Sequence, residues 1–114
     1  MSKGEFLGAF EEIVLLALLQ LGDQAYGMTV RREIEDRGQR SVSIGAVYST
    51  LDRLEAKGYV ASRIADPSPV RRGRARRYFT VEAAGEQALA RSREMTNRMW
   101  QGLEPGAVDS TRER

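Results

Sequence analysis

Residues 43–58, which read SIGAVYSTLDRLEAKG, contain the most informative pattern in this chain. Ser43 is a residue type that favours the N-cap of a helix, and Gly58 is one that favours its end. Between them, apolar side chains recur at the spacing of one helical stripe, namely Ile44, Val47, Leu51 and Leu54. The pattern predicts a short helix whose stripe faces a core and whose opposite face is exposed.

The predicted outer face of this helix is small near its start and basic toward its end. Such a helix fits the major groove of DNA, which is about 12 Å wide, because small residues allow a close approach while serine and arginine donate hydrogen bonds. Its N-terminal amides also favour a phosphate. Tyr48 lies at the edge of the stripe. The candidate DNA-binding residues of this stretch are Ser43, Gly45, Ala46, Tyr48, Ser49 and Arg53.

Two further helices are predicted before this one. The block from about Glu5 to Leu21 is apolar on most sides, so it must be covered on most sides. In a chain of 114 residues, we expect part of that cover to come from another subunit. A second helix is predicted from about Tyr26 to Arg37, with Gly38 as its left-handed cap residue. The second and third helices together are typical of a helix-turn-helix.

A basic β-hairpin is predicted after the helix-turn-helix. Two strand-like runs, about Tyr59–Ala65 and Arg74–Thr80, flank a loop that contains two prolines and a glycine. The segment 63–77 carries a charge of +5, whereas the whole chain carries +2. A hairpin in this place is typical of the wing of a winged helix, and local basic charge favours a polyanion over a merely solvated loop. The candidate phosphate-binding residues are Arg71, Arg72, Arg74 and Arg76.

Side chains of a strand alternate between its two faces, so Arg76 and Arg77 should point in opposite directions. We therefore expect one of the two to face away from DNA.

The last predicted helix runs from about Val81 or Glu82 to Leu103 and ends before Pro105. Its apolar residues exceed what a small three-helix core can cover, and such a patch favours a symmetric interface. Residues 1–80 are thus expected to form the DNA-binding domain, 81–104 a dimerisation helix and 105–114 a disordered tail. The candidate dimer-interface residues are Phe10, Leu89, Met95, Met99, Trp100 and Leu103.

Composition excludes several classes of function. The chain has no cysteine and no histidine, which removes disulfides, thiol nucleophiles, serine–histidine triads and most zinc sites. No catalytic constellation or cofactor motif is evident, so we expect neither an enzyme nor a bound cofactor or metal. The longest apolar run, Ile13–Leu19, is too short to span a bilayer, and the N-terminus does not resemble a signal peptide. A cytoplasmic protein that does not enter the membrane is expected.

The sequence also resembles the PadR-like transcriptional regulators, over residues 5 to about 104. The resemblance implies a mainly α-helical winged helix-turn-helix with a small β-hairpin and a single long C-terminal helix, as in the compact subgroup of the family. It further implies a homodimeric, sequence-specific DNA-binding regulator, usually a repressor. The resemblance rests on Phe10–Leu19 with Ala25-Tyr26-Gly27, on Ser43–Leu54, on Lys57-Gly58-Tyr59-Val60, and on Gly73–Thr80 followed by Gly85.

Several residues have two interpretations at this point. Tyr48 is either core or close to the DNA backbone, and Arg53 either contacts DNA or pairs with Asp52 or Glu55. Trp100 is either dimer packing or a contact for a small aromatic ligand at the dimer interface. The resemblance includes one family member in which paired tryptophans on the C-terminal helices sandwich aromatic ligands. Counting from Gly85, Thr96 occupies that tryptophan's position here, and Trp100 lies about one turn later.

The chain as a whole has two interpretations as well. A homodimer with two-fold symmetry would set two recognition helices about one DNA turn apart, roughly 34–36 Å, and so match a palindromic operator in double-stranded DNA. The alternative is a winged-helix module that binds protein instead. The arginine-rich hairpin favours DNA.

Overall fold

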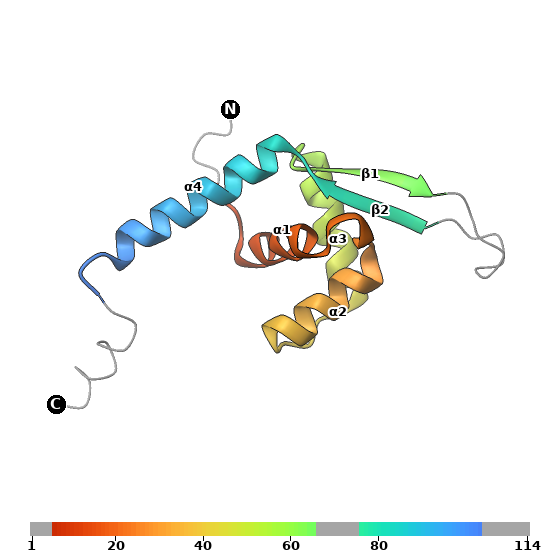
Figure 1. The fold of residues 1–114 in the computed structure, drawn as a ribbon, viewed down its shortest axis with the longest axis horizontal. Coiled ribbons are helices and arrows are strands. Elements are labelled where there is room, and N and C mark those ends of the chain that lie inside the picture. The colour runs from red at the N-terminus through yellow and green to blue at the C-terminus, as the bar shows by residue number, and fades with distance from the viewer. Residues whose placement is uncertain (1–5, 66–75, 104–114) are drawn as a thin grey trace.

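The computed structural model describes residues 6–65 and 76–103. It shows three helices, a two-stranded antiparallel hairpin and a long final helix, so the predicted fold class is confirmed (Figure 1). The elements in chain order are α1 (Ala9–Leu21), a 3-10 turn η1 (Gly22–Gln24), α2 (Gly27–Gly38), α3 (Ile44–Ala56), β1 (Val60–Ala65), β2 (Arg76–Val81) and α4 (Ala83–Trp100).

The core lies where α1, α2, α3 and the hairpin meet. α1 is the central helix, since it packs against α2, α3, β2 and α4. The predicted stripe of α3 is buried against it, with Val47, Leu51 and Leu54 fully inaccessible. α1 nevertheless keeps two leucines on the surface, Leu16 and Leu19, which are 45% and 47% exposed. Its apolar sides are therefore only partly covered within one chain.

The hairpin is joined to the helices through its second strand. β1 and β2 pair antiparallel from Val60 with Val81 to Ala65 with Arg76. The segment before α2 adds to the outer edge of β2, because Tyr26 bridges to Tyr78 and the N–H of Phe79 donates to the carbonyl of Ala25 at 2.9 Å. Phe79 itself is buried, so one face of the hairpin closes the core.

Some predicted helix boundaries are wrong. α1 begins at Ala9, not near Glu5, because Gly8 is in an extended conformation and its N–H donates to Glu11 in the first turn. α2 includes Gly38, and the left-handed cap residue is Gln39, with φ of 54°. The extra residue completes the turn that follows the buried Ile34.

The end of α4 also differs from the expectation. The helix stops at Trp100, three residues before Leu103, and Gly102 has a φ of 83°, which only glycine adopts readily. The predicted stop at Pro105 lies outside the described residues.

α4 leads away from the three-helix body, on the side opposite strands β1 and β2 (Figure 1). Only its first turns are packed, with Gly85, Ala88 and Leu89 buried. Residues from Arg93 onward are exposed. Within residues 6–65 and 76–103, no helix has the length and apolar character needed to cross a membrane.

Candidate nucleic-acid interface

The outer face of α3 is exposed, as the sequence predicts. Ser43 is the N-cap, and its hydroxyl accepts a hydrogen bond from the N–H of Ala46 at 3.0 Å. The hydroxyl proton of Ser43 is not used by this bond. Gly45, Tyr48, Ser49 and Arg53 are exposed, and Ala46 is half-buried. α3 thus presents an uncharged, small-residue surface over its first two turns.

Ion pairs hold α3 on two opposite flanks of this face. On one flank, Arg77 of the hairpin pairs with Asp52, with 3.3 Å between Nη1 and Oδ1, and with Glu55. On the other flank, Glu11 of α1 pairs with Arg53 and Lys57. At about 100° per residue, the surface between these flanks is that of Gly45, Ser49 and Ala56. The ion pairs therefore fix the helix while leaving this surface exposed.

The pairing of Arg77 also separates the two neighbouring arginines of β2. Arg77 points toward α3, on the face of the hairpin that carries Phe79, and its guanidinium lies 4.8 Å from that ring. Arg76 lies on the other face, as the alternation of a strand requires.

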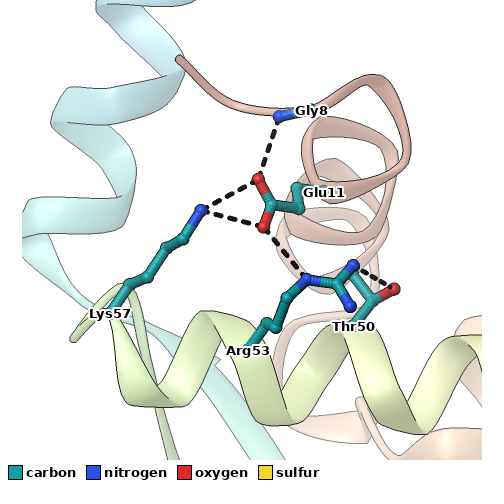
Figure 2. A network of polar contacts seen from close by, with 5 residues as sticks. All are labelled: Gly8, Glu11, Thr50, Arg53 and Lys57. Atoms are coloured by element: carbon teal, nitrogen blue, oxygen red, sulfur yellow. Dashed lines mark hydrogen bonds and ion pairs between the residues drawn. The ribbon is translucent and has the colours of Figure 1, made fainter. Parts of the chain in front are cut away.

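Glu11 is a buried carboxylate with three hydrogen-bond donors (Figure 2). It is 6% exposed. Its Oε1 accepts from the N–H of Gly8 at 2.9 Å, its Oε2 lies 2.9 Å from Nζ of Lys57, and the same Oε2 accepts from Nε of Arg53 at 3.4 Å. Burial alone would raise the pKa of Glu11, but the bonds from Gly8, Lys57 and Arg53 outweigh it and lower the pKa below 4.5. Glu11 is therefore ionised at neutral pH.

Arg53 does not pair with Asp52 or Glu55, which is the alternative that the sequence left open for it. Asp52 and Glu55 pair with Arg77, whereas Arg53 pairs with Glu11 and donates from Nη2 to the hydroxyl of Thr50 at 3.2 Å. The side chain of Arg53 is still 56% exposed. Sequence reasoning missed Glu11, because the contact joins residues 42 positions apart. The first turn of α1 carries two adjacent carboxylates, Glu11 and Glu12, and the sequence does not distinguish which of them is buried.

Tyr48 combines features of both roles considered for it. Its ring lies on the backbone of Gly27 at the start of α2, where an added Cβ would be 2.3 Å from its Cζ and Oη. The side chain is nevertheless 39% exposed. Tyr48 is thus a surface residue of α3 that packs against α2 and is not part of the core.

Arginines and tyrosines stack on one face of the hairpin, from its middle toward its loop end. The guanidinium of Arg76 lies 4.0 Å from the ring centre of Tyr26, and that of Arg63 lies 4.7 Å from the ring centre of Tyr78. The two tyrosines meet edge to face at 5.4 Å. A hydrogen bond to Tyr78 raises the pKa of Arg76 further, so this arginine stays charged. Arg71, Arg72 and Arg74 lie outside the described residues.

The predicted interface residues of α4 differ in how far a single chain covers them. Leu89 is 9% exposed and belongs to the core of the single chain, whereas Met99 and Leu103 are 73% and 53% exposed. Met95 lines a cleft next to Phe6 and Leu7 on one side of α4. Phe10 is half-buried, with the guanidinium of Arg40 5.9 Å from its ring centre.

Trp100 lies on the other side of α4, in a groove of about 640 Å³ between α1 and α4. Leu16 and Leu19 line the same groove from α1, and Leu89 and Thr96 line it from α4. Exposed apolar side chains from both helices, namely Leu16, Leu19 and Trp100, therefore line one groove. Among the described residues, no cluster of acidic side chains could hold a metal ion.

Comparison with known proteins agrees with this architecture. The model of the transcriptional regulator PadR-like family matches residues 15–91. The transcriptional regulator Rv3488 of Mycobacterium tuberculosis is 38% identical over 73 residues, which are 62% of this chain and 62% of that protein, so the chain spans less than two thirds of that relative.

Solved structures show the same fold. A PadR family transcriptional regulator from Eggerthella lenta has a TM-score of 0.65 and 24% identity, over 80% of this chain and 77% of that one. PadR of Bacillus subtilis, solved in complex with operator DNA, has a TM-score of 0.63 and 19% identity, over 74% of this chain and 46% of that one.

Proposed function

Because this chain belongs to the transcriptional regulator PadR-like family, whose members are not enzymes, we propose that it is a homodimeric repressor that binds a palindromic operator. α3 enters the major groove, and the hairpin reaches the flanking DNA. Residues 1–80 form the DNA-binding domain, and residues 81–104 form the dimerisation helix. The observation that carries this proposal is the exposed, small-residue face of α3, held between two sets of ion pairs.

The contacts proposed for DNA divide by chemistry. Ser49 and Arg53 reach base edges, because they lie on the exposed face of α3. Gly45 and Ala46 allow the close approach, and the Ser43 and Tyr48 hydroxyls reach the sugar–phosphate backbone. Base contacts give specificity, whereas phosphate contacts give affinity that falls with salt. The candidate phosphate contacts are the hairpin arginines Arg71, Arg72, Arg74 and Arg76.

The proposed dimer is supported by exposed apolar surface on α1 and α4. Leu16, Leu19 and Trp100 border one groove and are each more than 40% exposed. A second copy of α4, carrying Met99 and Leu103, is the proposed cover for this surface, since contiguous apolar patches on monomers are rarely left in water. The same groove is the proposed place for a small aromatic ligand, because Trp100 and Thr96 line it together.

Removal of hairpin charge tests the proposed DNA contacts. The triple variant Arg72→Ala, Arg74→Ala, Arg76→Ala should weaken binding to every duplex. It should also lower the slope of log K against log salt by about 2–3, because each lost phosphate contact lowers it by about 0.9. The measurement is fluorescence anisotropy with labelled duplexes from 50 to 300 mM salt.

The control is Arg91→Ala with Arg98→Ala, which removes two positive charges from α4, a helix that leads away from the hairpin strands (Figure 1). This variant should change the slope by less than about 1. An unchanged slope in the folded hairpin variant would exclude these phosphate contacts, and salt-independent or absent DNA binding by the native protein would favour the protein-interaction module.

A further inference from the structure

The network around Glu11 has a geometry that a purely structural ion pair does not need. Glu11 holds Arg53 by Nε, and Thr50 holds it by Nη2 (Figure 2). Both fixing groups are buried, at 6% and 2% exposure. The Arg53 side chain that they hold remains 56% exposed. An exposed arginine side chain is thus anchored to two buried groups.

Only some of the N–H groups of the Arg53 guanidinium are used in these two hydrogen bonds. A guanidinium carries five N–H donors in a rigid plane, and the two hydrogen bonds use one donor on Nε and one on Nη2. Three N–H groups of Arg53 remain for an external acceptor. They belong to a side chain about 40° around α3 from Ser49, on the border of its exposed face.

Charge balance also favours an external anion. Within the network, the single negative charge of Glu11 faces the two positive charges of Arg53 and Lys57. The side chain of Lys57, at 31% exposure, takes the shorter contact with the carboxylate, at 2.9 Å, whereas Arg53 has the longer one, at 3.4 Å. The excess positive charge therefore lies on the more exposed cation.

From this geometry we propose that Glu11 is a positioning residue for DNA recognition, which acts through Arg53. Glu11 and Thr50 hold the guanidinium in the orientation in which its remaining N–H groups meet DNA. The arginine side chain therefore loses its conformational entropy when the protein folds, and DNA binding does not have to order it. This inference rests on the proposed DNA-binding function of α3.

A double-mutant cycle tests the proposal. Four proteins are compared, namely the native chain, Glu11→Gln, Arg53→Ala and the double variant. The probes are a duplex enriched by the native protein from a random-sequence pool and a scrambled duplex of the same composition. Glu11→Gln should weaken binding to the enriched duplex about tenfold, and in the Arg53→Ala background this weakening should be absent.

The sign of the Glu11→Gln effect separates positioning from long-range charge. Removal of a negative charge from the protein favours DNA binding by charge alone, so tighter binding by Glu11→Gln would overturn the proposal. If Glu11 has a purely structural role, the folded Glu11→Gln variant should bind DNA as tightly as the native protein does, although its thermal midpoint is lower. Alternatively, Glu11→Gln should weaken DNA binding equally with and without Arg53. Either result would also overturn it.

Thr50→Val provides a second cycle that keeps every charge, in case Glu11→Gln does not fold. It should weaken binding about two- to threefold, a fraction of one hydrogen bond to a charged group, and only when Arg53 is present. No loss, or the same loss without Arg53, would contradict the proposal. If the native protein enriches and binds no duplex, the proposed function itself fails, which is a separate outcome from a cycle without coupling.

Discussion

At the scale of single residues, Gly85 determines how closely α4 approaches the body of the protein. An added Cβ at this position would lie 2.4 Å from the carbonyl oxygen of Tyr59 and 2.9 Å from Cγ1 of Val81. The same carbonyl oxygen accepts the N–H of Glu82 at 2.9 Å, just before α4 begins. Backbone cannot move aside as a side-chain end can, so glycine is required for this packing.

We therefore predict that Gly85→Ala destabilises the protein by about 1–3 kcal/mol, as overpacking typically does. Gly45→Ala is the matched control, because no heavy atom lies within 4 Å of the Cβ it would add and alanine favours a helix. Gly45→Ala should leave stability unchanged or slightly raised. Urea unfolding monitored by circular dichroism measures both variants, and equal stability for the two would refute the argument.

At the scale of elements, α3 is positioned by charged contacts with two different elements. Glu11 connects it to α1, and Arg77 connects it to β2. The Arg77 contacts are partly exposed and contribute little energy individually. The Glu11 contact is buried, so loss of its charge has a larger effect on the free energy of unfolding.

The lowered pKa of Glu11 predicts how the α1–α3 contact depends on pH. Because the folded pKa lies below the unfolded value of 4.5, the carboxylate stabilises the fold fully well above pH 4.5. This contribution is lost as the pH falls through the folded pKa. We expect Glu11→Gln to be less stable than the native protein at pH 7 by about 1–3 kcal/mol.

Thermal unfolding of both proteins between pH 7 and pH 3 measures this effect. The difference in stability should be constant above about pH 5 and should shrink below pH 4.5, because a protonated Glu11 resembles glutamine. The other carboxylates titrate in both proteins and cancel from the comparison. A difference that stays constant down to pH 3 would contradict the predicted direction.

At the scale of the whole molecule, the chain covers its α1–α2–α3 core but not the distal half of α4. Leu16, Leu19 and Trp100 stay exposed around one groove. The apolar surface left on α1 and α4 is the physical reason to expect a second copy.

Leu16→Ser combined with Trp100→Ser should convert the proposed dimer to a monomer. Both side chains are already 45% and 44% exposed in the single chain, so the fold of each subunit should persist. Ile64→Ser is the matched control, since Ile64 is 64% exposed but lies on the hairpin. Light scattering at micromolar concentration should give one subunit mass for the first variant and two for the native protein and the control. A single subunit mass for the native protein would refute the dimer.

The order and type of the main elements follow from local sequence patterns. The apolar stripe of α3, its Ser43 cap and the prolines and glycine between the two strand-like runs are local signals, because each depends on residues a few positions apart. Helix ends, as at Gln39 and Gly102, depend on contacts beyond the local pattern, so the sequence does not predict them to the residue.

Which side chains meet across the fold depends on tertiary packing. Glu11 with Arg53, Arg77 with Glu55, and Arg76 with Tyr26 join residues 42, 22 and 50 positions apart. Tertiary packing also places Leu89 in the core. Hydrophobic periodicity records which face of an element is buried, but it does not record the partner. The partner follows from how the helices cross, and that depends on the packing of the whole core.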